Sequence, residues 1–323
     1  MAQYPRTSET DSAPTTGRNT GLTRRGYVRS IAAVATATTA VGATGTATVA
    51  ASGDDPETDD REYEVIEAEN QTITIDSGET WENKLIDMTT GQDIIITARG
   101  SDWTIRNVGF EGENVSGTGS ATFGLADSGG ESLVENVYLG DGSDDRNGAP
   151  TGHGQTAFWV EPDHAGHIDF EYVNIQNFAD NAIYASAPGN GGGGTIHVDS
   201  CFAANCYVSH YRLATEGSKV TNSAVLVDDD GYAGRGIWAW SPGTVEVDDC
   251  QLEMNGQNVA IDAGANGQAT TVTVTDTDYD EAAGIAEHDG SSVELEDGVG
   301  TDPDAAVPEG VPTSPEEAAD PDA

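Results

Sequence analysis

The stretch "IRNVGFEG" at residues 105–112 sets a pattern that much of the chain repeats. An apolar and a polar residue precede a central, mostly polar position, and small, polar and apolar residues follow it. Later copies include "VENVYLGDG" at residues 134–142 and "VDDCQLEMNG" at residues 247–256. A repeat of 22 to 36 residues predicts stacked supersecondary units. The central positions of seven copies are Asn107, Asn136, Tyr172, Ser200, Asn222, Asp249 and Asp276.

Alternation within each copy indicates short strands. In "TVEVDDCQLEM" at residues 244–254, Val245 and Val247 share one face, and Cys250 and Leu252 return to that face after a polar turn. No helical period of useful length occurs after residue 60. We therefore predict an all-β fold, a single-stranded right-handed parallel β-helix (solenoid) of about eight coils. The central polar residue is expected to face inward and to stack on its counterparts in neighbouring coils.

Two other architectures are also built from short repeated units. A leucine-rich repeat is excluded because leucine is scarce and its consensus is missing. A β-sandwich remains an alternative, since it also consists of short strands separated by turns. The sandwich, however, gives no reason for a bend residue to recur once in every copy. The repeat therefore favours the β-helix.

The charge is strongly acidic. The 323 residues include 56 acidic and 13 basic side chains, a formal net charge of −43. Such a chain repels phosphate backbones and anionic membranes, which argues against nucleic-acid binding. At molar salt the Debye length falls to roughly 3 Å and the self-repulsion is screened. The composition therefore predicts a halophilic protein, the alternative being an ordinary acidic secreted one. Three cysteines give no disulfide framework.

The N-terminal region carries an export signal. "LTRRGYVRS" at residues 22–30 precedes an Ala/Thr-rich, weakly apolar run, as in a Tat-type signal peptide. We expect a signal peptide at 1–52, an acidic linker at 53–64, the β-helix at 65–300 and an acidic, Pro-rich disordered tail at 301–323. The mature chain is expected to be secreted or at the extracellular surface, monomeric, and without a membrane span.

The coil pattern over about residues 65–300 resembles the pectate-lyase-like superfamily of secreted β-helix proteins. This resemblance implies a role on polysaccharide, because the superfamily includes lyases, glycoside hydrolases, epimerases, tailspikes and proteins without known catalysis. Its lyases bind calcium through aspartates that bridge a uronate, and an Arg or Lys then removes the proton beside the carboxylate. Carried over, the resemblance implies Asp228 and Asp230 as calcium ligands and Arg235 or Arg212 as the base.

Aromatic residues near these positions are candidates for stacking on sugar rings. They are Trp238 and Trp240, which follow Arg235, together with Tyr211, Trp159, Tyr184 and Tyr207. His153 is added as a candidate substrate contact; it lies in "TGHGQTAFWVEPDHAGHIDF" at residues 151–170. We expect that segment to be a loop insertion with solvated histidines, because it follows the longest interval between copies. Its "GHG" resembles a polygalacturonase motif, but the other motifs of that family are missing or out of order.

These features predict an exported β-helix protein that acts on or binds extracellular polysaccharide. One form of this function is a calcium-assisted polyuronate lyase. The alternative is a non-catalytic carbohydrate-binding or cell-surface structural solenoid. No motif in the chain requires catalysis, so the sequence does not decide between these two forms.

Overall fold

The computed structural model describes residues 61–115, 120–143, 154–229, 231, 234–240 and 242–322. Residues 61 onward form one compact unit. The expected signal peptide at 1–52 and most of the linker at 53–64 lie outside the described residues. No helix in the described part of the chain is both long and apolar enough to span a membrane.

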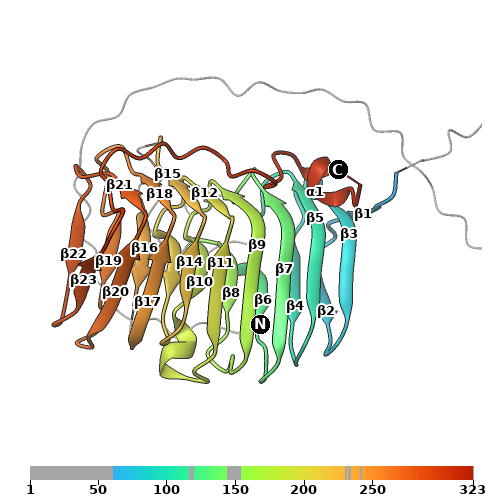
Figure 1. Ribbon diagram of the computed structural model, residues 1–323. Helices are drawn as coiled ribbons and strands as arrows, with labels where there is room; N and C mark the ends of the chain where they lie inside the picture. Colours follow the sequence, from blue (N-terminus) through green and yellow to red (C-terminus); the bar gives the residue numbers. More distant parts are fainter. Residues whose placement is uncertain are drawn as a thin grey trace, which may run out of the picture. The chain divides into compact units, whose positions relative to one another are not determined.

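The chain winds alternately through two long parallel sheets (Figure 1). In each sheet the hydrogen-bonded neighbours come from successive turns of the chain, and every strand pair is parallel. This arrangement confirms the predicted all-β fold of the parallel β-helix kind. In the described part of the chain, the sheet that we call sheet B contains nine strands and the other, sheet A, contains the rest; the predicted count of about eight coils is not confirmed.

Sheet A has a main path and a short side path. The main path is β1 (Glu64–Glu67), β3 (Thr80–Asp87), β5 (Thr104–Glu111), β7 (Glu131–Leu139), β9 (His167–Gln176), β11 (Thr195–Asp199), β14 (Lys219–Thr221), β17 (Gly243–Asp248), β20 (Thr270–Thr275) and β23 (Ser292–Leu295). The side path is β12 (Phe202–Ala204), β15 (Ala224–Leu226), β18 (Gln251–Glu253) and β21 (Asp278–Tyr279).

Sheet B forms the opposite wall of the coils. Its strands are β2 (Gln71–Ile75), β4 (Ile94–Ala98), β6 (Ala121–Leu125), β8 (Thr156–Val160), β10 (Asn181–Ala185), β13 (Ser209–Leu213), β16 (Arg235–Ala239), β19 (Ile261–Ala263) and β22 (Ile285–Glu287). A 3-10 helix, η1 (Ala187–Asn190), follows β10, and an α-helix, α1 (Pro315–Ala319), lies near the C-terminus.

The core lies between the sheets, where apolar side chains stack in register. On sheet B the inward row is fully buried, and Phe123 stacks on Phe158 with ring centroids 4.5 Å apart. Cutting one such ring to a methyl group typically costs 3–5 kcal/mol, so this row contributes strongly to stability. The residues of the inward row are Ile96, Phe123, Phe158, Ile183, Tyr211, Ile237 and Ile261.

The central residues of the repeat all adopt the left-handed backbone conformation. Their φ angles lie between 43° and 55°, and Asn83, one coil earlier, shares this conformation at 56°. Asparagine tolerates this region best among residues with a side chain, which explains its frequency at the bend. The expected stacking occurs at the first positions, where Asn107 Nδ2 donates to Asn83 Oδ1 at 2.8 Å and Asn136 Nδ2 donates to Asn107 Oδ1 at 3.0 Å. We call these bend positions the ladder.

The ladder side chains do not face inward as expected. All of them are half-buried or exposed, because the left-handed residue turns the strand and points its own side chain outward. The inward positions after the bend are taken by Cys201, Ser223, Cys250 and Thr277, whose exposed fractions are between 0 and 3%. All three cysteines of the chain are free and buried.

The C-terminal segment, residues 301–322, is not a disordered tail. It runs back along the side of the solenoid, and α1 packs on β5, β3 and β7 (Figure 1). Backbone groups of the segment bond to the coils: Asn174 Nδ2 donates to Pro312 O at 2.8 Å and Asn136 Nδ2 to Ala318 O at 3.2 Å. Its apolar residues Ala305 and Val311 are buried in a cluster with β12 and β15. These contacts hold the segment despite its acidic, Pro-rich composition.

Candidate functional site

A row of aromatic and charged residues follows the outer face of sheet B. Strand pairing places Tyr184, Arg212, Trp238 and Asp262 side by side on four successive strands. The row lies outside because residues on either side of an inward-facing position point the opposite way, and Ile183, Tyr211, Ile237 and Ile261 face the core. Neighbours in such a row are about 4.8 Å apart, so like chemistry accumulates in a line.

Arg212 lies among three aromatic rings. Its guanidinium carbon is 4.1 Å from the ring centroid of Tyr184, 4.3 Å from that of Trp238 and 3.7 Å from that of Trp240. Its Nε donates to Ser186 Oγ at 2.8 Å, and only 5% of the residue is exposed. Cation–π contacts of a desolvated guanidinium each contribute up to about 2 kcal/mol. The rings therefore hold Arg212 in its charged form and in one orientation.

Arg235 contacts the same indole ring. Its guanidinium carbon lies 4.1 Å from the Trp238 centroid, and its Nε donates to Asp262 Oδ2 at 2.7 Å. The other oxygen of Asp262 lies 3.1 Å from His288 Nε2. The Asp262 side chain is 3% exposed, that of Arg235 17% and that of His288 55%. Solvent therefore reaches this end of the row at the histidine. We name Tyr184, Arg212, Arg235, Trp238, Trp240, Asp262 and His288 the arginine–tryptophan cluster.

Two buried titratable residues adjoin this cluster. Burial raises the pKa of Asp180 to about 7, although the charge of Arg212 acts to lower it. Burial lowers the pKa of His210 to about 4. The imidazole of His210 accepts from the amide of Cys206 at 3.2 Å, and its Nδ1 lies 2.7 Å from the carbonyl oxygen of Arg235. These contacts fix a neutral tautomer with the proton on Nδ1 and hold the backbone from which Arg235 extends.

The structure brings together most of the sequence-predicted residues. Arg212, Arg235, Trp238 and Trp240 belong to the cluster, and Trp159 packs on Tyr184 with centroids 4.4 Å apart. The three indoles are largely covered, with exposed fractions of 5 to 8%, so only their edges reach the surface. Tyr211 is placed differently: its side chain is fully buried in the core, where it cannot meet a sugar on the surface. His153 and Asp230 lie outside the described residues. Tyr184, a further stacking candidate, lies one coil before Arg212. Asp262 and His288 were not predicted as site residues, although counting one coil forward from Trp238 leads to Asp262.

The expected calcium ligand Asp228 stabilises a turn. It accepts from Asn205 Nδ2 at 2.7 Å, while Asn205 Oδ1 accepts from the amides of Asp228 and Asp229. Among the contacts of the described residues, none joins Asp228 to either arginine. Among the residues that the structure describes, no group of three or more His, Cys, Asp or Glu side chains is arranged to hold a metal ion. Calcium binding by Asp228 and Asp230 stays a prediction.

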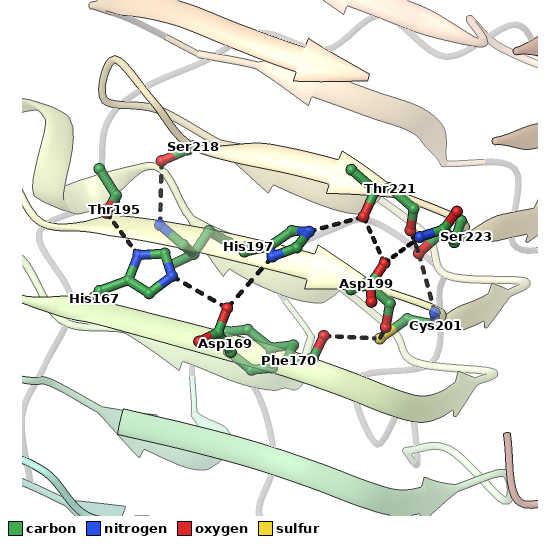
Figure 2. A network of polar contacts seen from close by, with 12 residues as sticks. His167, Asp169, Phe170, Thr195, His197, Asp199, Cys201, Ser218, Thr221 and Ser223 are labelled. Atoms are coloured by element: carbon green, nitrogen blue, oxygen red, sulfur yellow. Dashed lines mark hydrogen bonds and ion pairs between the residues drawn. The ribbon is translucent and has the colours of Figure 1, made fainter. Parts of the chain in front are cut away.

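A second polar network lies on the outer face of sheet A (Figure 2). One oxygen of Asp169 is shared by two imidazoles, with His167 Nε2 at 3.1 Å and His197 Nδ1 at 3.4 Å. Thr221 Oγ1 lies 2.7 Å from His197 Nε2 and donates to Asp199 at 2.5 Å. Burial, followed by the charge of Lys219, lowers the pKa of His197. The network links three coils, and its side chains satisfy one another.

The segment 151–170 is not a simple loop insertion. Residues 156–160 form β8 and His167 begins β9, so most of the segment belongs to the regular coil. His164 is fully buried rather than solvated, with its ring nitrogens near Asp127 and the Thr195 carbonyl oxygen. Burial lowers the pKa of His164.

Relatives of the chain were sought in three ways. Comparison with protein-family models, with curated proteins and with solved structures yields no match to this chain. Its function is therefore inferred from its own residues and their geometry.

Proposed function

We propose that this protein binds acidic polysaccharide through the arginine–tryptophan cluster on the outer face of sheet B. The observation that carries the proposal is that two guanidiniums, those of Arg212 and Arg235, lie over one indole ring, at 4.3 and 4.1 Å from its centroid. A chain with 56 acidic and 13 basic residues has few cations available, so two in one aromatic cluster are locally distinct. Arg212 lies beneath the surface at 5% exposure, and Arg235 is the one that solvent reaches.

The chemistry of the cluster suits a sugar acid. The apolar face of a pyranose ring packs on an indole or phenol ring, and guanidinium groups pair with carboxylates in a planar geometry. Tyr184 and Arg235, both half-buried, and the exposed His288 are the groups that a chain of sugars would meet first. A linear ligand lying across the strands would pass one such position at roughly every 4.8 Å.

The general electrostatics set the conditions for binding. The net charge of −43 repels a polyanion at low ionic strength. At molar salt the Debye length is about 3 Å, so long-range repulsion disappears while contacts at the cluster persist. Binding is therefore expected only at high salt, which agrees with the proposal that the protein is halophilic.

The contacts of the two arginines favour binding over β-elimination. A base must lose its proton to act, but Arg212 is stacked on three rings and Arg235 is ion-paired to Asp262. Each of these contacts stabilises the protonated guanidinium. We therefore propose a non-catalytic carbohydrate-binding solenoid. Export by the Tat pathway and membership of the pectate-lyase-like superfamily are parts of the same proposal.

The test is a binding assay in molar NaCl with polygalacturonate and alginate, and with dextran as a neutral polymer. Isothermal titration calorimetry should show binding of the acidic polymers only. The variant Arg235→Gln/Asp262→Asn removes both members of the ion pair and should weaken binding by at least roughly tenfold. Arg106→Gln is the matched control, because Arg106 Nε also donates to a carboxylate, that of Glu82, at 2.5 Å on sheet A.

Two results would contradict the proposal. One is an equal loss of affinity in the Arg106→Gln control, which would mean a nonspecific charge effect. The other is no binding of either acidic polymer by the wild type at any salt concentration. Ultraviolet absorbance of unsaturated products, recorded with and without calcium, distinguishes a lyase from a binding protein.

A further inference from the structure

A hollow of about 560 Å³ lies between the ladder and the C-terminal segment. Asn107, Asn136 and Tyr172 line one side of it, and residues 309–310 line the other. It therefore exists only because the C-terminal segment folds back over the solenoid. It is separate from the arginine–tryptophan cluster and from the polar network around Asp169 on sheet A.

Tyr172 is the unusual residue of this hollow. It has a φ of 55°, at a ladder position where the two preceding coils carry asparagine. A bulky aromatic residue rarely adopts this backbone conformation, and a strained position that persists is an indication of function. Its half-buried ring lies against Gly310, where an added Cβ would come within 3.2 Å of Cε1. Among the described residues no group hydrogen-bonds to its hydroxyl.

Tyr172 also interrupts the chain of amide hydrogen bonds. Asn136 donates to Asn107, but the next coil offers no amide to donate to Asn136 in turn. Within the described part of the chain, Asn136 Oδ1 has no donor. The carboxylates of Glu135 and Glu309 also line the hollow, and no hydrogen bond to either is found among the described residues. The hollow thus combines an aromatic ring with several open acceptors.

We propose that this hollow binds a neutral sugar unit, which stacks on the ring of Tyr172 and donates its hydroxyl hydrogens to Asn136 Oδ1, Glu135 and Glu309. A pyranose has the required apolar face and a rim of donors. Arg106 lies at the edge of the hollow and donates its Nε–H to Glu82. Its other N–H groups can donate to a sugar oxygen.

The charges around the hollow exclude a sugar acid. Glu171 is the strand neighbour of Glu135, and burial together with the charges of Asp169, Glu135 and Asp199 raises the pKa of Glu171. An anionic ligand would meet the same repulsion. An organic cation would be attracted at low ionic strength, but molar salt screens that attraction and leaves stacking intact. The hollow is therefore proposed to bind a neutral sugar, whereas the arginine–tryptophan cluster is proposed to bind an acidic one.

Saturation-transfer NMR in molar NaCl tests the proposal with the methyl glycosides of glucose, galactose and mannose. We expect saturation transfer to at least one of them. Tyr172→Asn removes the ring, suits the left-handed backbone and supplies the missing amide donor to Asn136. It should weaken binding by roughly tenfold or more, which corresponds to about 1.4 kcal/mol. Glu309→Gln should weaken binding less, because an amide oxygen still accepts.

Ser200→Asn is the matched control, because it introduces asparagine at the next ladder position and leaves the ring of Tyr172 in place. It should bind like the wild type. Absence of transfer to every glycoside, or wild-type binding by Tyr172→Asn, would overturn the proposal, and so would tighter binding of glucosamine at high salt. Acidic-polysaccharide binding should be unchanged in Tyr172→Asn, so a failure here is distinguishable from a failure of the proposed function.

Discussion

Arg235 and Asp262, on neighbouring strands of sheet B, form an ion pair of 2.7 Å in which the carboxylate side chain is only 3% exposed. A charge placed so far from water depends on its partners. His288 Nε2 lies 3.1 Å from the second carboxylate oxygen, but a histidine is charged only when it is protonated. Of these two partners, Arg235 is therefore the one that is always charged. The pair joins two coils and fixes the end of the arginine–tryptophan cluster.

Replacing Arg235 with Met should therefore destabilise the protein markedly. Breaking a buried pair by removing one partner typically costs about 3–5 kcal/mol, because a buried charge remains. Urea denaturation in molar salt would measure this loss. Lys84→Met is the control, since Lys84 pairs at 2.7 Å with Glu64, whose side chain is 64% exposed, and such a pair contributes at most about 1 kcal/mol. Equal losses in both variants would contradict the buried-pair interpretation.

His210 should make the protein acid-sensitive. Its pKa is lowered from 6.5 to about 4, so the folded state keeps the imidazole neutral where the unfolded state binds a proton. Stability is then fully present above pH 6.5 and falls as the pH drops toward about 4, by roughly 3 kcal/mol in all. Protonation would direct an N–H at the amide of Cys206.

Urea denaturation as a function of pH checks this prediction. His210→Gln can still donate to Arg235 O and accept from Cys206, so it should fold and should lose less stability than the wild type between pH 6.5 and about 4. Parallel pH profiles for the two proteins would mean that other groups cause the acid sensitivity.

Asp180 should make the folded protein less stable as the pH rises, which is the opposite of the effect of His210. Its pKa is raised from 3.8 to about 7, so the folded state retains a proton that the unfolded state has lost. Its contribution is most favourable below pH 3.8 and is lost as the pH rises toward about 7, by roughly 4 kcal/mol in all. Asp180→Asn imitates the protonated acid. Its stability relative to the wild type should rise across this range in denaturation experiments, and a constant difference would contradict the assignment.

The fold was predictable because local preference and repeat spacing agree. Asn107, Asn136 and Asn222 recur at coil intervals, and each needs the left-handed conformation that asparagine tolerates. The shared face of Arg212 and Trp238 follows from the same spacing. Tyr211 could have been excluded from the surface, because neighbours in a strand point to opposite sides and Arg212 points outward.

The C-terminal segment and the hollow were not predictable in this way. Acidic, Pro-rich composition indicates disorder, but Val311 is buried in the same apolar cluster as Phe202, more than a hundred positions earlier in the chain. Composition carries no information about such a contact. The position of the half-buried Tyr172 ring beside Gly310 likewise depends on the path of this segment, which no local pattern encodes.

Gly109 should determine whether the C-terminal segment stays in place. It lies in β5 directly beneath α1, and a Cβ added there would come 1.8 Å from the carbonyl oxygen of Pro315. Backbone cannot yield by that amount, so Gly109→Ala should displace α1 while the coils, which pack independently of it, remain folded. Glutamyl endopeptidase should then cleave after Glu309 and Glu316 faster than in the wild type, by roughly tenfold for each 1.4 kcal/mol of lost contact.

The control is Gly124→Ala, at a strand glycine of sheet B where the added Cβ would meet its nearest neighbour, Glu161 Oε1, at an ordinary 3.6 Å. Mass spectrometry of the digests should find early C-terminal cleavage in the Gly109 variant alone, with unchanged circular dichroism in both. Because the hollow needs residues 309–310, Gly109→Ala should also lose binding of the methyl glycosides. Cleavage at the wild-type rate in Gly109→Ala would mean that contacts made before α1, such as the hydrogen bond from Asn174 to Pro312, suffice to hold the segment.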